Sequence, residues 1–520
     1  MDHLPVQVSL LLLALALLIR AARRPASPAL PPGPKGLPLF GNLFQVPSKL
    51  LWVKLVEWSK VYGPIYSYSL VGQPIIVLTS LHDASELLDR LSAKTSDRPR
   101  LIKLSERMCQ GKQFGMIPRN DVWKRYRRAS HQSLNVRAAE NYWPMQEEEA
   151  RILLDGLINH PEIDSVKHIH REASSIGWRA CFGHTTIPLE GPDPSEPMEE
   201  FFHEVFRAVV PGSSIVDVFP FLNPLITRSK FLRRSVTDKF YERATAFFIK
   251  SFSEPQVSRW RGVLTHRLDD PYHSGRGRSF IEPNVERNRE ADWYGYSARL
   301  RLGRRDIVTA TALKWFLLAM ILYPETAAPA RAELERVVGN RPPSFADMDR
   351  LPQIEAMVKE LLRWRPPAAG GVVHMATEDI VYEEYLIPKG AMLLPIAWSI
   401  CRDPSVYPNG DAFDPSRFID GMGNVKSPLP HTHEDYLAFG HGRRICVGKS
   451  FAINSLSIST AHLLWAFDFQ KGVDEHGVEV TPDPMAFLDN GATVYPKPFP
   501  VKLVPRLPDL AERLKAVLSK

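Results

Sequence analysis

The stretch Phe439-Gly440-His441-Gly442-Arg443-Arg444-Ile445-Cys446-Val447-Gly448 decides the fold. Its cysteine stands alone, without the paired Cys or His ligands at short spacing that structural zinc needs. The glycines let the backbone approach a flat ligand and point several N–H groups at one sulfur, which favours the thiolate form of the cysteine. The run therefore predicts a cysteine thiolate that serves as a ligand. The alternative is a structural cysteine buried in a glycine-rich turn.

With every fixed position present, this pattern, F-x-x-G-x-R-x-C-x-G, resembles the haem-binding loop of the cytochromes P450. The resemblance implies that Cys446 is the axial ligand to the iron of heme b, and that Phe439, Arg444 and Gly448 contact this cofactor. A thiolate ligand pushes electron density onto haem iron and favours cleavage of the O–O bond. The resemblance covers nearly the whole chain, and it implies a mainly α fold with a smaller β-rich part.

Composition limits the cellular setting and the partners of the chain. The 520 residues carry a net charge of +7 and four widely spaced cysteines, which form no disulfide framework and so indicate a reducing compartment. The basic residues are dispersed and do not gather in a stripe, so nucleic acid is not an expected partner. A membrane surface, with lipid as a contact, or an acidic redox protein explains the charge better.

The N-terminus has the pattern of a membrane anchor. Residues 4–19 are almost wholly apolar and are followed by Arg20, Arg23 and Arg24, whereas a cleaved secretory signal carries its positive charge before the apolar core. The proline-rich run that follows resembles the hinge of microsomal cytochromes P450. We expect an anchor over 1–24, a hinge over 25–36 and a haem domain over 37–520. This predicts a single-pass protein of the endoplasmic reticulum membrane, with its catalytic domain facing the cytoplasm.

Glu360 and Arg363 lie three residues apart and so share one helix face. A buried pair of this kind needs its remaining hydrogen-bonding groups satisfied, and Arg417, from the run Phe413–Phe418, is a candidate for this role. The three residues resemble the E-x-x-R helix and the P-x-R-F segment that brace the haem loop in the family. An isolated E-x-x-R motif is common on solvated helix faces and indicates little by itself. Here the motif indicates the family because it lies ahead of the cysteine loop, in the family's order.

Trp123 and Arg127 are four residues apart and also share a helix face. An indole N–H beside a guanidinium suits the carboxylates of haem, and the pair resembles the W-x-x-x-R helix of the family. By the same resemblance, His374 and Arg444 match two further positions that contact the haem propionates. Without the resemblance, residues 124–128 are a solvated basic face and His374 is an ordinary loop histidine.

The remaining sequence predicts helices with short strands between them. Alternation predicts one hairpin around Gly72 and a second one over Tyr382–Pro395, with its turn at residues 388–390. Helical periodicity is clearest in three segments: Met145–Gly156, Met198–Val210 and Ala327–Val338. The resemblance places Val372 and Phe487 in the substrate pocket, with ordinary core positions as the alternative.

The chain departs from the family in its middle. The family motif A/G-G-x-D/E-T, whose acid and alcohol deliver protons to oxygen, is absent, and Asp306 and Thr309 are the nearest substitutes. The segment 251–305 contains eleven arginines and no lysine, and helical periodicity fails there. Three interpretations stay open: a divergent segment, an oxygen-independent relative, and a misassembled sequence.

The function expected from the resemblance is a haem-thiolate monooxygenase that hydroxylates or epoxidises a hydrophobic small molecule. Because the chain has no dinucleotide-binding loop, electrons are expected from NADPH through a separate NADPH–cytochrome P450 reductase, with cytochrome b5 as a possible second donor. The motif wording resembles fungal cytochromes P450 of secondary metabolism, which suggests a terpenoid or polyketide intermediate. The alternatives are a haem-binding protein without monooxygenase turnover, either a rearranging enzyme or a defective copy, and a non-haem membrane scaffold.

Overall fold

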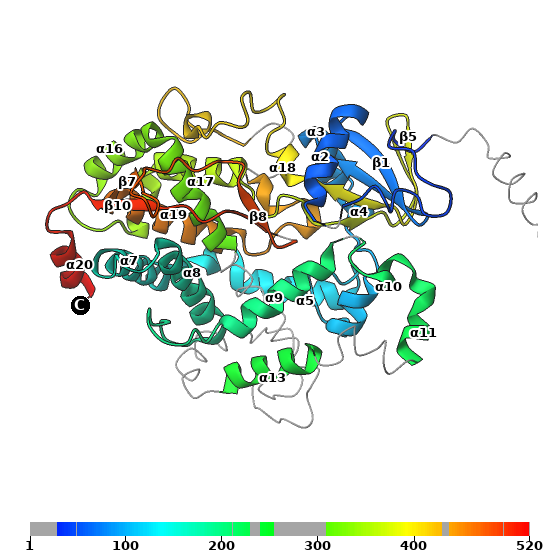
Figure 1. Ribbon diagram of the computed structural model, residues 1–520, viewed down its shortest axis with the longest axis horizontal. Coiled ribbons are helices and arrows are strands. Elements are labelled where there is room, and N and C mark those ends of the chain that lie inside the picture. The colour runs from blue at the N-terminus through cyan, green and yellow to red at the C-terminus, as the bar shows by residue number, and fades with distance from the viewer. Residues whose placement is uncertain are drawn as a thin grey trace, which may run out of the picture.

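The computed structural model describes residues 29–47, 49–210, 212–228, 240–253, 308–428, 436–491 and 493–518. Within them the chain is mainly helical with a smaller β-rich part, which confirms the predicted fold class (Figure 1). The longer helices are α2 Leu51–Tyr62, α5 Asp121–Leu134, α7 Trp143–Asn159, α8 Ser165–Phe182, α9 Glu196–Val209, α13 Phe240–Ser253, one over 308–322, α16 Ala327–Val337, α17 Pro352–Trp364, α19 Lys449–Ala466 and α20 Leu510–Leu518.

Short helical segments connect these elements. They are α3 Leu81–Ala84, η1 Ser85–Arg90, α4 Ser92–Thr95, η2 Ile102–Met108, α6 Val136–Glu140, α10 Ile215–Val218, η3 Pro220–Leu222, α11 Asn223–Arg228, η6 Pro324–Thr326, η7 Phe345–Arg350, α18 Ala397–Ile400, η8 Pro415–Phe418, η9 Leu437–Phe439 and η10 Gly442–Arg444. The three helices predicted from periodicity are present as α7, α9 and α16.

The main sheet has four strands in the order β1-β2-β6-β3, and Figure 1 shows it beside α2 and α3 at one end of the molecule. Strands β1 (Ile65–Leu70) and β2 (Gln73–Leu78) form the first predicted hairpin. Both residues of its tight turn, Val71 and Gly72, have positive φ, which is the geometry that matches the twist of paired strands.

The second predicted hairpin is wrong in its pairing. Strand β5 (Tyr385–Ile387) pairs with β4 (Ile380–Tyr382), whereas β6 (Met392–Pro395) runs parallel to β2 and antiparallel to β3 (His374–Met375). Strand β6 is apolar at every position, as suits a strand with neighbours on both sides. Two further pairs complete the β part: β7 Phe467–Lys471 with β10 Val501–Pro505, and β8 Phe487–Asp489 with β9 Val494–Pro496.

Three buried helices form the interior on which the functional loop rests. Helix α19 is buried on nearly all sides, and its apolar residues do not gather on one face, as expected for a helix surrounded by other elements. Helix α17 begins with Pro352 at its first position and ends before Pro366, because the residue preceding a proline is driven out of the helical region. Its last turns are buried together with the segment 308–322, and each large apolar side chain here contributes roughly 1.5–3 kcal/mol.

The localisation prediction requires a correction. The expected anchor over residues 1–24 lies outside the described residues, and among those that are described no helix has the length and apolarity needed to cross a bilayer. The single-pass anchor, and the endoplasmic reticulum placement that depended on it, are therefore withdrawn. The described part of the expected hinge lies along β1, where Ser67 donates hydrogen bonds to the carbonyls of Pro31 and Pro32 at 2.6 and 2.7 Å.

Candidate haem site

The loop that carries Cys446 runs from η9 through η10 to the start of α19. Its backbone is folded back on itself, because the Cys446 N–H donates to the carbonyl of Phe439 at 2.9 Å. Asp89 fixes the loop from outside by accepting the Gly442 N–H at 2.6 Å and lying 3.3 Å from Nδ1 of His441. Gly442 has a φ of 52°, and a Cβ there would lie 2.1 Å from the carbonyl oxygen of Leu88. Only glycine fits this position.

Two of the four cysteines, Cys446 and Cys109, line one cavity. Cys109 is buried, and burial raises the pKa of its thiol to about 12, so it is a neutral thiol at physiological pH. Cys446 is the exposed cysteine among the four, and its side chain opens into the cavity. The cavity wall also includes apolar residues of α9, Phe201 and Phe202, and Val308 at the start of the helix over 308–322.

Cationic and hydrogen-bonding side chains gather at one part of the same cavity. Trp123 and Arg127 come from α5, and Arg444 comes from the cysteine loop. The Arg444 guanidinium lies over the Trp123 ring, 4.4 Å from its centroid. Burial lowers the pKa of Arg444 to about 10, which leaves it charged at neutral pH. Arg127 donates to the carbonyl of Ile445 at 2.5 Å and so ties α5 to the residue before Cys446.

Two buried donors in this region have no hydrogen-bond partner within the described residues: Nε1 of Trp123 and Nη1 of Arg444. Unsatisfied buried polar atoms are rare in proteins and call for an explanation. A carboxylate bound in this region of the cavity would accept from both, since charge-assisted hydrogen bonds to guanidinium and N–H donors are the strong ones. The residues present therefore fit a flat cofactor that carries carboxylates at one edge and an iron ligated by sulfur.

His374 also lines the cavity, and burial lowers its pKa well below the usual value. Its Nδ1 lies 3.0 Å from the carbonyl oxygen of Thr95, so Nδ1 carries the hydrogen. In the neutral ring Nε2 is then an acceptor. A donor role toward a carboxylate requires the imidazolium form, which a nearby anion favours.

Behind the loop, the structure brings Glu360, Arg363 and Arg417 together. Arg363 donates to both carboxylate oxygens of Glu360, with Nε–Oε2 at 2.6 Å and Nη2–Oε1 at 2.7 Å. Nε of Arg417 lies 3.4 Å from Oε1 of Glu360. The remaining Arg363 donors reach the backbone carbonyls of Cys401, Gly410 and Ala412. Because the Glu360 side chain is fully buried, these hydrogen bonds and ion pairs are needed to offset the cost of removing its charge from water.

The other predicted site residues are more scattered. Val372 and Phe439 line the cavity. Gly448 instead forms the N-cap of α19, and Phe487 packs against the rings of Trp52 and Trp398. Thr309 is buried in the helix over 308–322, one residue beyond the cavity-lining Val308.

Two predictions concern residues outside those that the structure describes. Asp306 lies outside the described residues, as does the part of the anomalous segment that spans 254–305.

Sequence reasoning missed two residues of the site. Arg98 lines the cavity and donates to the carbonyls of Gly115, at 3.1 Å, and of Val373. Asp89 fixes the cysteine loop across more than 350 residues of sequence. Neither residue stands in a local pattern that marks its role, because the contact that defines each role is with a distant segment.

Comparison with known proteins identifies the class of the chain. The family model described as Cytochrome P450 matches residues 31–268 and 308–494. Cytochrome P450 monooxygenase 253 of Postia placenta is 35% identical over 98% of this chain and 95% of its own length. A cytochrome P450 monooxygenase of Armillaria gallica is 37% identical over 92% and 90%. Cytochrome P450 monooxygenase claR of Ampulloclitocybe clavipes is 34% identical over 94% and 89%.

The chain belongs to the cytochrome P450 family. It is a monooxygenase, an oxidoreductase that uses dioxygen and electrons from a reductase, as are the relatives it matches over most of its length. Members of this family hold haem through a cysteine thiolate. The family match omits 269–307, which includes Asp306 and overlaps the segment that the sequence marked as anomalous, and it resumes one residue before Thr309.

Proposed function

We propose that Cys446 is the iron ligand of a heme b held in the described cavity. The observation that carries the proposal is the contrast between the two cysteines of that cavity: one is a buried neutral thiol, and the other is exposed to the space in which the cofactor would lie. When bound, haem supplies the iron centre at which dioxygen is activated. Trp123, Arg127 and Arg444 would hold the propionates, and His374, which lines the same cavity, would contact the cofactor beside them.

The chain's own residues would then orient the substrate and exclude water. Phe201 and Phe202 from α9, with Val372 and Val308, give the cavity an apolar wall. Such a wall selects a hydrophobic small molecule. We propose that the product is a hydroxylated or epoxidised compound, with a terpenoid or polyketide intermediate of fungal secondary metabolism as the substrate class. NADPH–cytochrome P450 reductase would supply the electrons, with cytochrome b5 as a second donor, and Thr309 is the described candidate for guiding protons.

A cavity-filling variant tests this proposal. Val372→Trp should abolish product formation from terpenoid or polyketide substrates in assays with reductase and NADPH, because the indole fills the substrate space. The carbon monoxide difference spectrum should persist. The matched control is Val381→Trp, at a position on β4 that is 67% exposed, which should leave turnover unchanged. Full turnover by Val372→Trp would contradict the assignment of this wall to substrate binding.

A further inference from the structure

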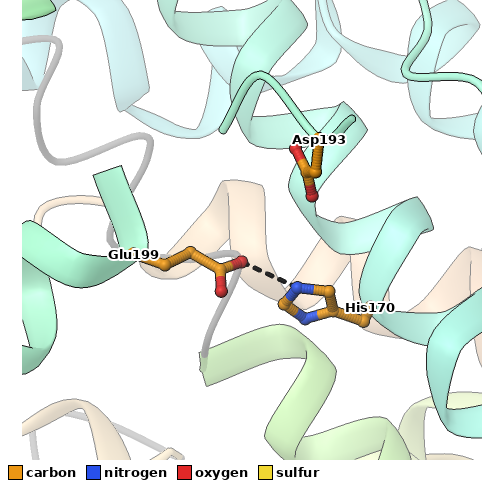
Figure 2. Close-up of side chains that lie close together, drawn as sticks. All are labelled: His170, Asp193 and Glu199. Carbon is orange, nitrogen blue, oxygen red and sulfur yellow. Dashed lines mark ion pairs between the residues drawn. The ribbon is translucent and has the colours of Figure 1, made fainter. Parts of the chain in front are cut away.

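A second cluster of ligating side chains lies outside the haem cavity. His170 from α8, Glu199 from α9 and Asp193 from the segment between these helices approach one another (Figure 2). One ligating atom from each of the three lies within 4.8 Å of the others. Nε2 of His170 is 2.8 Å from Oε1 of Glu199, and both side chains are partly exposed, at 38% and 19%. The cluster is therefore open to ions from solvent.

The surrounding bonds orient the two carboxylates. Ser195 donates its backbone N–H and its hydroxyl to Oδ1 of Asp193 at 2.7 and 2.6 Å, and Ser174 donates to Oε1 of Glu199 at 3.2 Å. Partners of this kind hold metal ligands in place when a cation is bound. These serine bonds go to Oδ1 of Asp193 and Oε1 of Glu199. Among the described residues, the second oxygen of each carboxylate is therefore the one that would bind a cation.

The positive charge in this neighbourhood is limited. The charge of Lys314 acts on His170 and lowers the pKa of the imidazole. Burial lowers the pKa of the Lys314 ammonium, and the carboxylates of Glu199 and Asp164 oppose that shift. Nζ of Lys314 lies over the Tyr495 ring, 5.5 Å from the centroid. The three carboxylates that act here, those of Asp193, Glu199 and Asp164, face one ammonium, so with a neutral imidazole the group carries a net charge of −2 that a divalent cation would offset.

We propose that His170, Asp193 and Glu199 form a divalent-cation site and that zinc is the ion that fits it best. One imidazole nitrogen and two carboxylate oxygens are a ligand set that zinc accepts, with water completing the coordination. In a tetrahedral zinc site ligand atoms lie about 3.4 Å apart, and these three lie within 4.8 Å of one another, so side-chain movements of at most about 1.4 Å would bring them to coordination distance. Alkaline-earth ions prefer six or more oxygens, which this set does not provide.

The position of the site gives it a consequence for the cavity. Phe201 and Phe202 follow Glu199 on α9 and line the cavity. An ion shared by His170 and Glu199 would fix the start of α9 against α8 and so hold this wall of the cavity in one position. Zinc is therefore expected to stabilise the protein and to alter substrate binding without touching the haem.

The test is calorimetric titration of the purified, haem-loaded protein with zinc alone after chelator treatment. The wild type should bind one zinc ion that His170→Gln and Asp193→Asn bind at least tenfold more weakly, while both variants keep the wild-type Tm without zinc. The matched control is His160→Gln, since His160 lies 3.3 Å from Glu162 in a His–Glu pair that has no third ligand among the described residues. This variant should bind zinc as the wild type does.

A second measurement follows stability. Saturating zinc should raise the Tm of the wild type and of His160→Gln by about 3 °C and leave that of Asp193→Asn unchanged. The proposal is overturned if the wild type, His170→Gln and Asp193→Asn bind zinc alike, or if His160→Gln loses as much binding as they do. The carbon monoxide spectrum is independent of this outcome, so failure of the zinc site leaves the haem assignment standing.

Discussion

The guanidinium of Arg363 closes a two-point ion pair on the carboxylate of Glu360, one helical turn away on the same buried face of α17. Three backbone carbonyls accept its remaining hydrogens, and the Asp414 N–H donates to Glu360 at 2.7 Å. The pair thus fixes the segment that precedes η8 against α17. The pair is strong because every N–H of Arg363 and both carboxylate oxygens of Glu360 have a hydrogen-bond partner, and not through Coulomb attraction alone.

Removing the guanidinium should be costly. Arg363→Met removes the two-point partner of the buried Glu360 carboxylate, with Arg417 still 3.4 Å from Oε1, and should lower the free energy of unfolding by about 3 kcal/mol in denaturant titrations. The matched control is Lys54→Met, which breaks the exposed Lys54–Glu57 pair of 2.9 Å. Since exposed pairs contribute about 0–1 kcal/mol, this control should change little. Equal losses in the two variants would show that Glu360 is not dependent on Arg363.

The glycine at 442 should be essential to the cysteine loop. Gly442→Ala places a methyl group 2.1 Å from the Leu88 carbonyl oxygen, in addition to the strain of its positive φ. Gly440→Ala is the control, because Gly440 also has a positive φ of 82° but its Cβ meets nothing within 4 Å. The control should cost about 1–3 kcal/mol, because Gly440, with φ 82° and ψ −165°, lies in a backbone region that is almost confined to glycine. Gly442→Ala should cost more in thermal unfolding and should lose bound haem, and similar stabilities for the two variants would refute the close contact.

The unpartnered indole N–H should matter for cofactor retention. Trp123→Phe keeps the aromatic ring under Arg444 and removes the buried Nε1 donor. Haem transfer to excess apomyoglobin should become about tenfold faster, as expected for the loss of one charge-assisted hydrogen bond. Trp58→Phe, at a buried tryptophan in α2, should transfer haem at the wild-type rate. An unchanged rate for Trp123→Phe would remove Trp123 from the haem contacts.

Glu172 should make stability depend on pH. The residue is fully buried on α8, accepts the Ser459 hydroxyl at 2.6 Å, and has its pKa raised to about 8 by burial. Because the folded pKa exceeds the unfolded one, its contribution is complete near pH 4.5 and is lost as the pH rises toward 8. Glu172→Gln stays neutral, so its stability relative to the wild type should increase by about 1 kcal/mol per pH unit between pH 6 and 8.

Denaturant unfolding at several pH values measures this slope separately from any constant packing effect of the glutamine. Glu475→Gln, at a side chain that is 87% exposed, serves as the control and should run parallel to the wild type. If Glu172→Gln also runs parallel to the wild type, Glu172 is ionised in the folded protein.

The features that the sequence predicted are those in which a few neighbouring residues determine the geometry. The turn at Val71 and Gly72 specifies the first hairpin, and the three-residue spacing of Glu360 and Arg363 places both on one helix face. Strand pairing between segments far apart in the sequence could not be predicted. Strand β6 joins β2 although more than 300 residues separate them, and its apolar sequence fits either neighbour equally well.

The site shows the same division. Local motifs predicted Trp123, Arg127 and Arg444, which line the cavity. Each motif also forms the element that carries these residues, α5 for the first two and η10 for Arg444. Arg98 and Asp89 act through contacts with backbone groups of remote segments, for which no spacing rule exists. Phe487 was placed by resemblance, and its ring lies in an aromatic group with Trp52 and Trp398.

The most direct test of the account is the carbon monoxide difference spectrum of the reduced protein and of two cysteine variants. Cys446 and Cys109 line the same cavity, and they differ in burial, since Cys446 is exposed and Cys109 is buried. The wild type and Cys109→Ala should show the Soret band of thiolate-ligated haem, and Cys446→Ala should lose it. A thiolate band that survives Cys446→Ala, or that disappears in Cys109→Ala with haem still bound, would contradict the assignment of Cys446 as the iron ligand.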